Sequence, residues 1–236
     1  MNIIEAKNLT FAYEENTKRH VIENMSFGLK AGTVTVLTGL SGCGKSTLCQ
    51  ILCGIIPEFT GGELTGTVML EGKDMTMMGM QDIAKKVGYV MQDPDRQIIA
   101  STVEDELAFA PENLCIEPKK IRSEVERVMD KLGITGLALK NPGKLSGGEK
   151  QITAIASKLT LDPDIVIMDE PFSLLDEKVA ELTNELGGKD ALVELKKNYY
   201  NDFLADMVMN RTEIHKIHDT GEGFVQLADP VFKDPA

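Results

Sequence analysis

The stretch Gly39-Leu-Ser-Gly-Cys-Gly-Lys-Ser-Thr47 decides how the rest of the chain is interpreted, because it satisfies the pattern G-x-x-x-x-G-K-[ST]. Its members are Gly39, Leu40, Ser41, Gly42, Cys43, Gly44, Lys45, Ser46 and Thr47. The glycines let the backbone turn tightly and bring its N–H groups close to a polyphosphate. We expect Lys45 to reach the β- and γ-phosphates and the Ser46 hydroxyl to coordinate Mg²⁺. The stretch therefore predicts a nucleotide-binding site.

The residues on either side supply the context that this pattern needs, which is a strand before it and a helix after it. The run Thr33–Thr38 is rich in β-branched residues, which predicts a strand. The run Ser46–Ile55 has apolar residues at helical spacing, which predicts a helix whose N-terminus faces the anion. Upstream, Tyr13 offers a flat surface on which a base could stack, although a half-buried strand tyrosine is the alternative.

Composition limits the class of protein. The chain has 236 residues, of which 42% are hydrophobic, enough for one large domain or for a core with an attached subdomain. A net charge of −12 argues against a nucleic-acid binder. No apolar run approaches the roughly 20 residues that span a bilayer, and the N-terminus lacks a secretory pattern, so we expect the chain in the cytosol. Cys49 and Cys53 are predicted to be buried and reduced, without a metal or a disulfide.

The remaining pattern predicts strands first and helices later. Residues 2–38 are expected to form strands and turns, and Pro57–Gly66 a loop before a strand at 67–70. The methionines of the segment 75–80 are expected to fill the core. A strand at 87–91 should end at Gln92. Residues from 93 to about 158 should then be mainly helical, with helices beginning near Thr102, Pro118 and Ser146, the first of them with acidic residues in its first turns.

Two later elements complete the constellation. The apolar run from Asp164 leads to Asp169 and Glu170, which is typical of a buried parallel strand that ends in acids. Asp169 is predicted to hold Mg²⁺ and Glu170 to act as the general base that activates water. The group Ser146, Gly147 and Gly148 at a helix N-terminus makes a second anion site, which two chains facing each other could use.

With these elements the chain resembles the ATP-binding cassette (ABC) ATPases. The similar segments are 39–47 (Walker A), 145–149 (Leu-Ser-Gly-Gly-Glu, the signature), 165–170 (Walker B), Gln92 (Q-loop), Ser173-Leu-Leu-Asp176 (D-loop) and Tyr13 (the adenine-stacking position). The resemblance implies an α/β fold: a P-loop NTPase core with a mainly parallel sheet, an N-terminal antiparallel β subdomain and an inserted α-helical subdomain at about 93–158. It implies one such domain over residues 1–236, with an atypical segment at about 177–236.

The resemblance also implies partners and cofactors. Two cassettes, identical or different, would sandwich two ATP molecules with Mg²⁺, each ATP between the phosphate loop of one chain and Ser146–Gly148 of the other. Gln92 would sense the metal. The segments 87–97 and 102–113 are similar to those of energy-coupling-factor importers, which take up vitamins or cobalt and nickel ions. This implies that the segment after Gln92 docks onto a transmembrane coupling subunit, at the cytoplasmic face of the membrane.

The C-terminal part departs from the family pattern. The family has a switch histidine after a strand, and the counterpart here is Thr212-Glu-Ile-His-Lys-Ile-His218-Asp219. This makes His218 the candidate sensor of the γ-phosphate. His215 is the alternative, and a surface histidine without a role is a third interpretation.

Two other functions compete with a transport ATPase. One is a cytosolic ABC ATPase that acts on nucleic acid or ribosomes, which the acidity and the single cassette disfavour. The other is a cassette that binds ATP without hydrolysing it and serves as half of a heterodimer, which the presence of Lys45, Asp169 and Glu170 disfavours.

Overall fold

The computed structural model describes residues 2–14, 19–37, 42–169, 214–219 and 225–227. The chain divides into two compact units, which are treated separately below. The first comprises Met1–Gly79 with Lys189–Ala236, and the second comprises Met80–Gly188. None of the helices in the described ranges is long and apolar enough to span a membrane.

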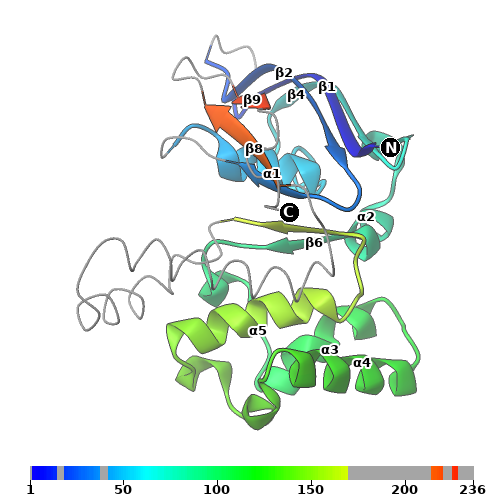
Figure 1. Cartoon of the computed structure of the whole chain (residues 1–236), viewed down its shortest axis with the longest axis vertical. Coiled ribbons are helices and arrows are strands. Elements are labelled where there is room, and N and C mark those ends of the chain that lie inside the picture. The colour runs from blue at the N-terminus through cyan, green and yellow to red at the C-terminus, as the bar shows by residue number, and fades with distance from the viewer. Residues whose placement is uncertain (1, 15–18, 38–41, 170–213, 220–224, 228–236) are drawn as a thin grey trace, which may run out of the picture. The chain divides into compact units, whose positions relative to one another are not determined.

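The first unit begins with an antiparallel sheet in the order β2-β1-β4-β5 (Figure 1). Its strands are β1 (Asn2–Ala12), β2 (Ile22–Lys30), β4 (Glu63–Leu70) and β5 (Lys73–Asp74). The inward side chains of β1 and β4 are apolar and fully buried, among them Ile4, Leu9, Phe11 and Leu70. This sheet agrees with the antiparallel N-terminal part that the sequence predicts.

A bulge in β1 explains why the apolar alternation of this strand is only loose. Asn8 has a φ of 49°, and the register with β2 shifts between Ala6 and Leu9. On β4, Gly66 (φ 88°) lies against this bulge, where a Cβ would be 2.5 Å from the backbone oxygens of Lys7 and Asn8. The prediction of a loop over Pro57–Gly66 is therefore wrong from residue 63 onward, because Gly66 belongs to a strand that faces a bulge.

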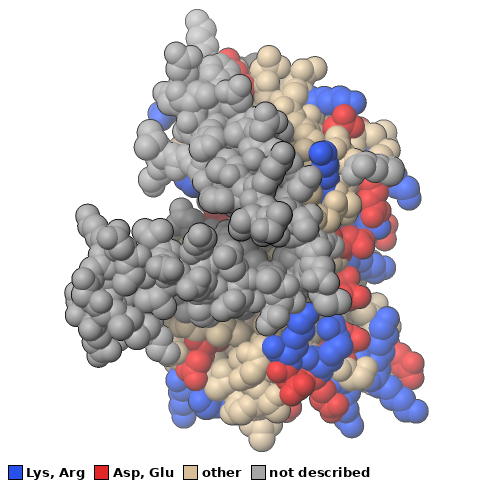
Figure 2. Space-filling view, viewed as in Figure 1, with Lys and Arg blue, Asp and Glu red and all other residues tan. Residues whose placement is uncertain are grey.

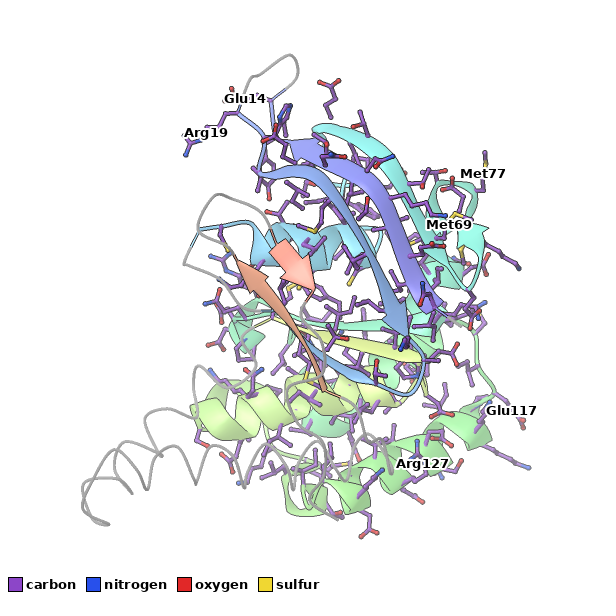
Figure 3. The ribbon with its side chains drawn as sticks, turned by 45° about the horizontal axis from the view of Figure 1, so that its top comes forward. Glu14, Arg19, Met69, Met77, Glu117 and Arg127 are labelled. Carbon is purple, nitrogen blue, oxygen red and sulfur yellow. The ribbon has the colours of Figure 1, made fainter. Side chains whose placement is uncertain are left out.

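Methionines follow the β4–β5 hairpin, in the short 3₁₀ segment η1 (Met75–Met77). Met75 is buried as expected, but Met77 is 87% exposed and points away from the sheet in Figure 3. The prediction that this cluster fills the core is thus correct for Met75 and wrong for Met77.

The second sheet of this unit has the order β3-β8-β9. Strand β3 (Val34–Leu37) runs parallel to β8 (Ile214–Asp219), which pairs with the antiparallel β9 (Val225–Leu227). Helix α1 (Lys45–Leu52) follows β3, and its side chains Leu48, Ile51 and Leu52 are buried. The helix ends three residues before the predicted end, because Gly54 takes a left-handed conformation (φ 74°).

The second unit contains a parallel strand pair and a group of helices. Helix α2 (Met80–Lys86) leads into β6 (Val87–Val90), which runs parallel to β7 (Ile165–Met168). The expected buried strand at 165–168 forms, although its residues are partly exposed rather than buried. The helices are α3 (Val103–Asn113), α4 (Pro118–Lys131) and α5 (Gly147–Leu159), with 3₁₀ segments η2 (Pro94–Arg96), η3 (Thr135–Leu137) and η4 (Pro142–Lys144).

An apolar cluster holds α3, α4 and α5 together, as their packing in Figure 1 indicates. Leu107 of α3 is fully buried, and Ile121, Val125 and Val128 present one face of α4, as the sequence spacing predicts. Gly133 (φ 67°) follows the end of α4. On the face drawn in Figure 2, Lys and Arg alternate with Asp and Glu over these described helices, and no extended basic patch is visible there.

Candidate functional site

The phosphate loop has the backbone that its glycines predict. Gly42 and Gly44 take left-handed conformations, with φ values of 79° and 96°. At Gly44, a Cβ would lie 3.0 Å from both Val21 Cγ1 and the Val21 carbonyl oxygen, so the close approach of the chain also favours glycine. The first residues of the motif, 39–41, lie outside the described residues.

Helix α1 begins directly at the end of this loop. Its N-cap is Gly44, which has no side chain to cap the helix, and the Gly44 carbonyl accepts a hydrogen bond from Leu48 N–H at 2.9 Å. Lys45 is the first helical residue, and its Nζ lies 3.9 Å from Cys43 Sγ. Ser46 is exposed. This arrangement suits an anion at the positive end of the helix dipole.

Tyr13 lies close to the same helix. Its hydroxyl is 2.9 Å from Thr47 Oγ1, and its ring meets the ring of Phe11 edge-on, with centroids 4.9 Å apart. It follows the last residue of β1 and is 51% exposed. The ring is therefore held beside α1 with about half of its surface exposed, which is compatible with a base stacking on it and also with a half-buried tyrosine at the end of a strand.

The second predicted anion site lies at the start of α5. Ser146 is the N-cap: its Oγ accepts from Glu149 N–H at 3.3 Å, and Glu149 Oε2 accepts from Ser146 N–H at 2.8 Å. The hydrogen bonds from Ser146 hold the pKa of Glu149 below its usual range, and Lys140 at 3.4 Å from Glu149 acts in the same direction. Gly147 and Gly148 are the first two residues of the helix. This reciprocal cap fixes the geometry of the signature segment.

Asp169 lies directly after β7. It is 6% exposed, its N–H donates to the Val90 carbonyl at 3.0 Å, and its Oδ2 accepts from the Tyr89 hydroxyl at 3.4 Å. The Val90 carbonyl thus holds the backbone of Asp169 beside β6, and the Tyr89 hydroxyl contacts its carboxylate. Glu170 and the residues predicted as the D-loop, Ser173–Asp176, lie outside the described residues.

The segment after β6 carries Gln92, which is exposed, and continues into η2. The structure adds Gln97 to the candidates, because its amide bonds to the backbone at Met91 and at Ala154. The sequence shows Gln97 only as the last residue of a polar turn. No periodicity or motif spacing in the chain distinguishes it from a solvated glutamine.

The histidine candidates lie on β8. The parallel register pairs Thr35 with His215 and Leu37 with Ile217, so His218 comes one position after the last residue paired with β3. The strand that precedes the phosphate loop and the strand that carries His218 are therefore neighbours. The segment 214–219 forms a strand, although polar residues such as those it contains are uncommon in the interior of a sheet.

No group of three or more His, Cys, Asp or Glu residues in the described ranges is close enough to hold a metal ion. The four cysteines are free; Cys49 and Cys53 are buried, as predicted, and burial together with the neighbouring Cys49 raises the pKa of the Cys53 thiol.

Comparison with known families identifies this arrangement. Residues 22–173 match the family model described as ABC transporter. The chain belongs to the ABC transporter family. As a member of this family it carries an ATP-binding domain, and its antiparallel sheet, parallel strands and helical group are those of an ABC nucleotide-binding domain. The predicted fold class is confirmed.

Individual ABC proteins resemble the chain over most of its length. It is 38% identical over 197 residues to a putative ABC transporter ATP-binding protein of Methanosarcina mazei, covering 82% of this chain and 34% of the relative. It is 35% identical over 175 residues to the energy-coupling factor transporter ATP-binding protein EcfA1 of Streptococcus agalactiae, covering 74% and 61%.

Among solved structures, CbiO1 of Clostridium perfringens, described as part of the ABC transporter complex CbiONQ, superposes with a TM-score of 0.64. It shares 28% sequence identity, and the match covers 84% of this chain and 74% of CbiO1. The chain spans about a third of the length of several curated relatives that it matches.

Proposed function

We propose that the chain is the ATP-hydrolysing subunit of an ABC importer of the energy-coupling-factor type. The observation that carries this proposal is the phosphate loop, in which Gly42 and Gly44 turn the backbone into the N-terminus of α1 with Lys45 as its first residue. The names of EcfA1 and CbiO1 support the importer class. As a peripheral subunit, the chain would work at the cytoplasmic face of the membrane.

Magnesium fits the donors that the chain offers. Ser46 supplies a hydroxyl, Asp169 a carboxylate and Gln92 an amide oxygen, and Mg²⁺ prefers oxygen ligands together with substrate phosphates. When bound, the ion neutralises charge that develops on the phosphates. In this proposal Lys45 binds the β- and γ-phosphates, and Tyr13 stacks on the base. The Tyr89 hydroxyl donates to Asp169 Oδ2 and would help to hold this carboxylate in place as a ligand.

Hydrolysis requires a base and a group that senses the γ-phosphate. We assign these roles to Glu170, the acid that follows Asp169, and to His218, the penultimate residue of β8. Glu170 would accept a proton from the attacking water. His218 would donate a hydrogen bond to the γ-phosphate, which stabilises the charge of the transition state. The register of β8 supports His218 over His215, because His215 pairs with Thr35 of β3, whereas His218 lies beyond the residues that pair with β3 and pairs only with Gln226 of β9.

The site is complete only when a second cassette supplies Ser146, Gly147 and Gly148 to the γ-phosphate. Replacement of Ser146 by arginine should lower hydrolysis by about 10²-fold or more, since a bulky side chain at the signature stops closure of the dimer. MgATP binding to the chain's own phosphate loop should change by less than about twofold. Steady-state phosphate release and calorimetry measure the two effects.

Ser123→Arg makes the same change at an exposed position on α4 and serves as the control. Loss of activity in both variants would indicate a general effect of the added arginine. Full activity in Ser146→Arg would remove the signature segment from the site.

Docking onto a membrane subunit is assigned to the segment 93–97. Arg96 is 82% exposed and its guanidinium lies 3.5 Å from the Asp93 carboxylate, so its charge faces solvent in this unit. Arg96→Glu should reduce co-purification with a polytopic membrane protein by about tenfold, because it reverses an exposed charge in the proposed docking segment. ATP hydrolysis by the isolated chain should remain unchanged.

Arg127→Glu reverses a charge on α4, where Arg127 pairs with Glu124 at 2.7 Å, and should leave co-purification intact (Figure 3). Equal co-purification of Arg96→Glu and the wild type would rule out Arg96 as part of the docking surface.

A further inference from the structure

The side chain of Gln97 connects two functional segments of the second unit. Its Oε1 accepts a hydrogen bond from Met91 N–H at 2.9 Å, and its Nε2 donates to the Ala154 carbonyl at 2.9 Å. Met91 immediately precedes Gln92, and Ala154 lies in the middle of α5, the helix that begins at the signature segment. We call these two hydrogen bonds the Gln97 bridge.

An amide suits the bridge, because it accepts at one end and donates at the other without a charge at any ordinary pH. The Ala154 carbonyl also accepts from Ser157 Oγ at 3.0 Å, so this carbonyl has a local partner as well as Gln97. Met91 N–H donates its hydrogen bond to the Gln97 side chain, because the pairing of β6 with β7 ends at Val90. Loss of the amide therefore leaves the backbone before Gln92 without this acceptor.

A second contact joins the same two segments one helical turn earlier. Lys150 Nζ lies 2.6 Å from Asp95 Oδ1, and the Lys150 side chain is only 18% exposed. Both connections run from the segment 91–97 to α5, at residues 150 and 154. A rigid helix held at two successive turns moves together with the segment that holds it.

We propose that Gln97 is a positioning residue that couples Gln92 to the signature segment through α5. This inference rests on the proposed function. When Gln92 shifts as it engages the metal, the bridge carries the shift to α5, and the Ser146 cap at the start of that helix moves with it. Gln97 touches neither nucleotide nor metal in this account. Gln97 instead aligns two parts of its own chain. These are Gln92, which senses the metal, and the Ser146 segment, which forms the anion site for the ATP bound to the other chain.

The first test replaces Gln97 with methionine, which keeps the length of the side chain and removes both hydrogen bonds. The affinity for MgATP should change by less than about twofold, while kcat should fall by about tenfold, equivalent to about 1.4 kcal/mol. The Mg²⁺ concentration that gives half-maximal activity should rise at the same time. A residue that only stabilises the fold would lower the melting temperature without shifting this Mg²⁺ dependence.

Gln81→Met is the matched control, because Gln81 is exposed on α2 in the same unit. It should leave kcat, the Mg²⁺ dependence and the melting temperature as they are in the wild type. Hydrogen exchange at the Met91 amide supplies a readout besides activity, and it should be faster in Gln97→Met than in Gln81→Met.

The second test replaces Gln97 with glutamate. The introduced carboxyl group can donate to the Ala154 carbonyl only when it is protonated, and protonation is favoured as pH falls. The ratio of kcat in Gln97→Glu to kcat in the wild type should therefore rise from pH 8 to pH 6, whereas this ratio stays flat for Gln97→Met. The charged groups on the segment and on α5 are Asp93, Asp95, Arg96, Glu149, Lys150 and Lys158, and Glu106 of α3 accepts hydrogen bonds from the backbone just after the segment.

The outcomes separate this inference from the proposed function. Absence of MgATP binding and hydrolysis in the wild type would refute the proposed function and the inference with it. Normal hydrolysis in the wild type, with kcat and Mg²⁺ dependence of Gln97→Met equal to those of Gln81→Met, would overturn the role of Gln97 alone. A loss of kcat without any change in Mg²⁺ dependence or in the pH ratio would likewise contradict coupling through the bridge.

Discussion

Lys45→Ala is expected to abolish MgATP binding. Lys45 is the first residue of α1 and directly follows the left-handed Gly44. Its ammonium group is therefore the positive charge closest in sequence to the glycines of the phosphate loop. Backbone N–H groups alone provide partial charges, and removal of a full charge from a phosphate site lowers the affinity by orders of magnitude. Isothermal titration calorimetry with MgATP measures the effect.

Lys73→Ala removes an exposed lysine from β5 in the same unit and should bind MgATP as the wild type does. The phosphate-loop assignment would be wrong if Lys45→Ala retained the wild-type affinity.

Glu170→Gln is expected to lower hydrolysis by about 10²-fold or more while MgATP binding survives. Glutamine keeps the shape and hydrogen bonding of glutamate, but it cannot accept a proton from water. An ATP-bound closed dimer should therefore accumulate, and light scattering with bound-nucleotide analysis detects it. Glu112→Gln, at an exposed position on α3, makes the same change elsewhere and should be fully active. Comparable turnover in Glu170→Gln and the wild type would exclude Glu170 as the base.

The phosphate loop and the signature segment could be predicted because local chemistry determines them. Only glycine readily takes the backbone angles of Gly42 and Gly44, and serine is a common N-cap residue, so a helix beginning near Ser146 could be expected. The helical face of Ile121 and Val125 follows from periodicity alone. These features depend on neighbours in sequence, so a single sequence is enough to find them.

Other features depend on residues far apart in the chain, and the sequence did not reveal them. The sequence alone predicts Gly66 to lie in a loop, whereas in the structure it belongs to β4 and lies opposite the bulge at Asn8. Glu106 looks like one of three solvated acids in the first turns of α3. In the structure it is 3% exposed, and it accepts hydrogen bonds from the Ile99 and Ala100 N–H groups at 2.9 and 3.0 Å. The Gln97 bridge spans 57 residues to Ala154 and leaves no periodic signal.

The most direct test of the account is phosphate release by the purified chain in MgATP, measured over a range of protein concentrations with Lys45→Ala as the blank. The account predicts Mg²⁺-dependent release that is absent from Lys45→Ala. If two copies of this chain form the sandwich, the rate should rise with roughly the square of the protein concentration while dimers are scarce. A wild-type chain that binds MgATP but releases no phosphate at any concentration would contradict the catalytic assignment, and would indicate the non-hydrolysing half of a heterodimer.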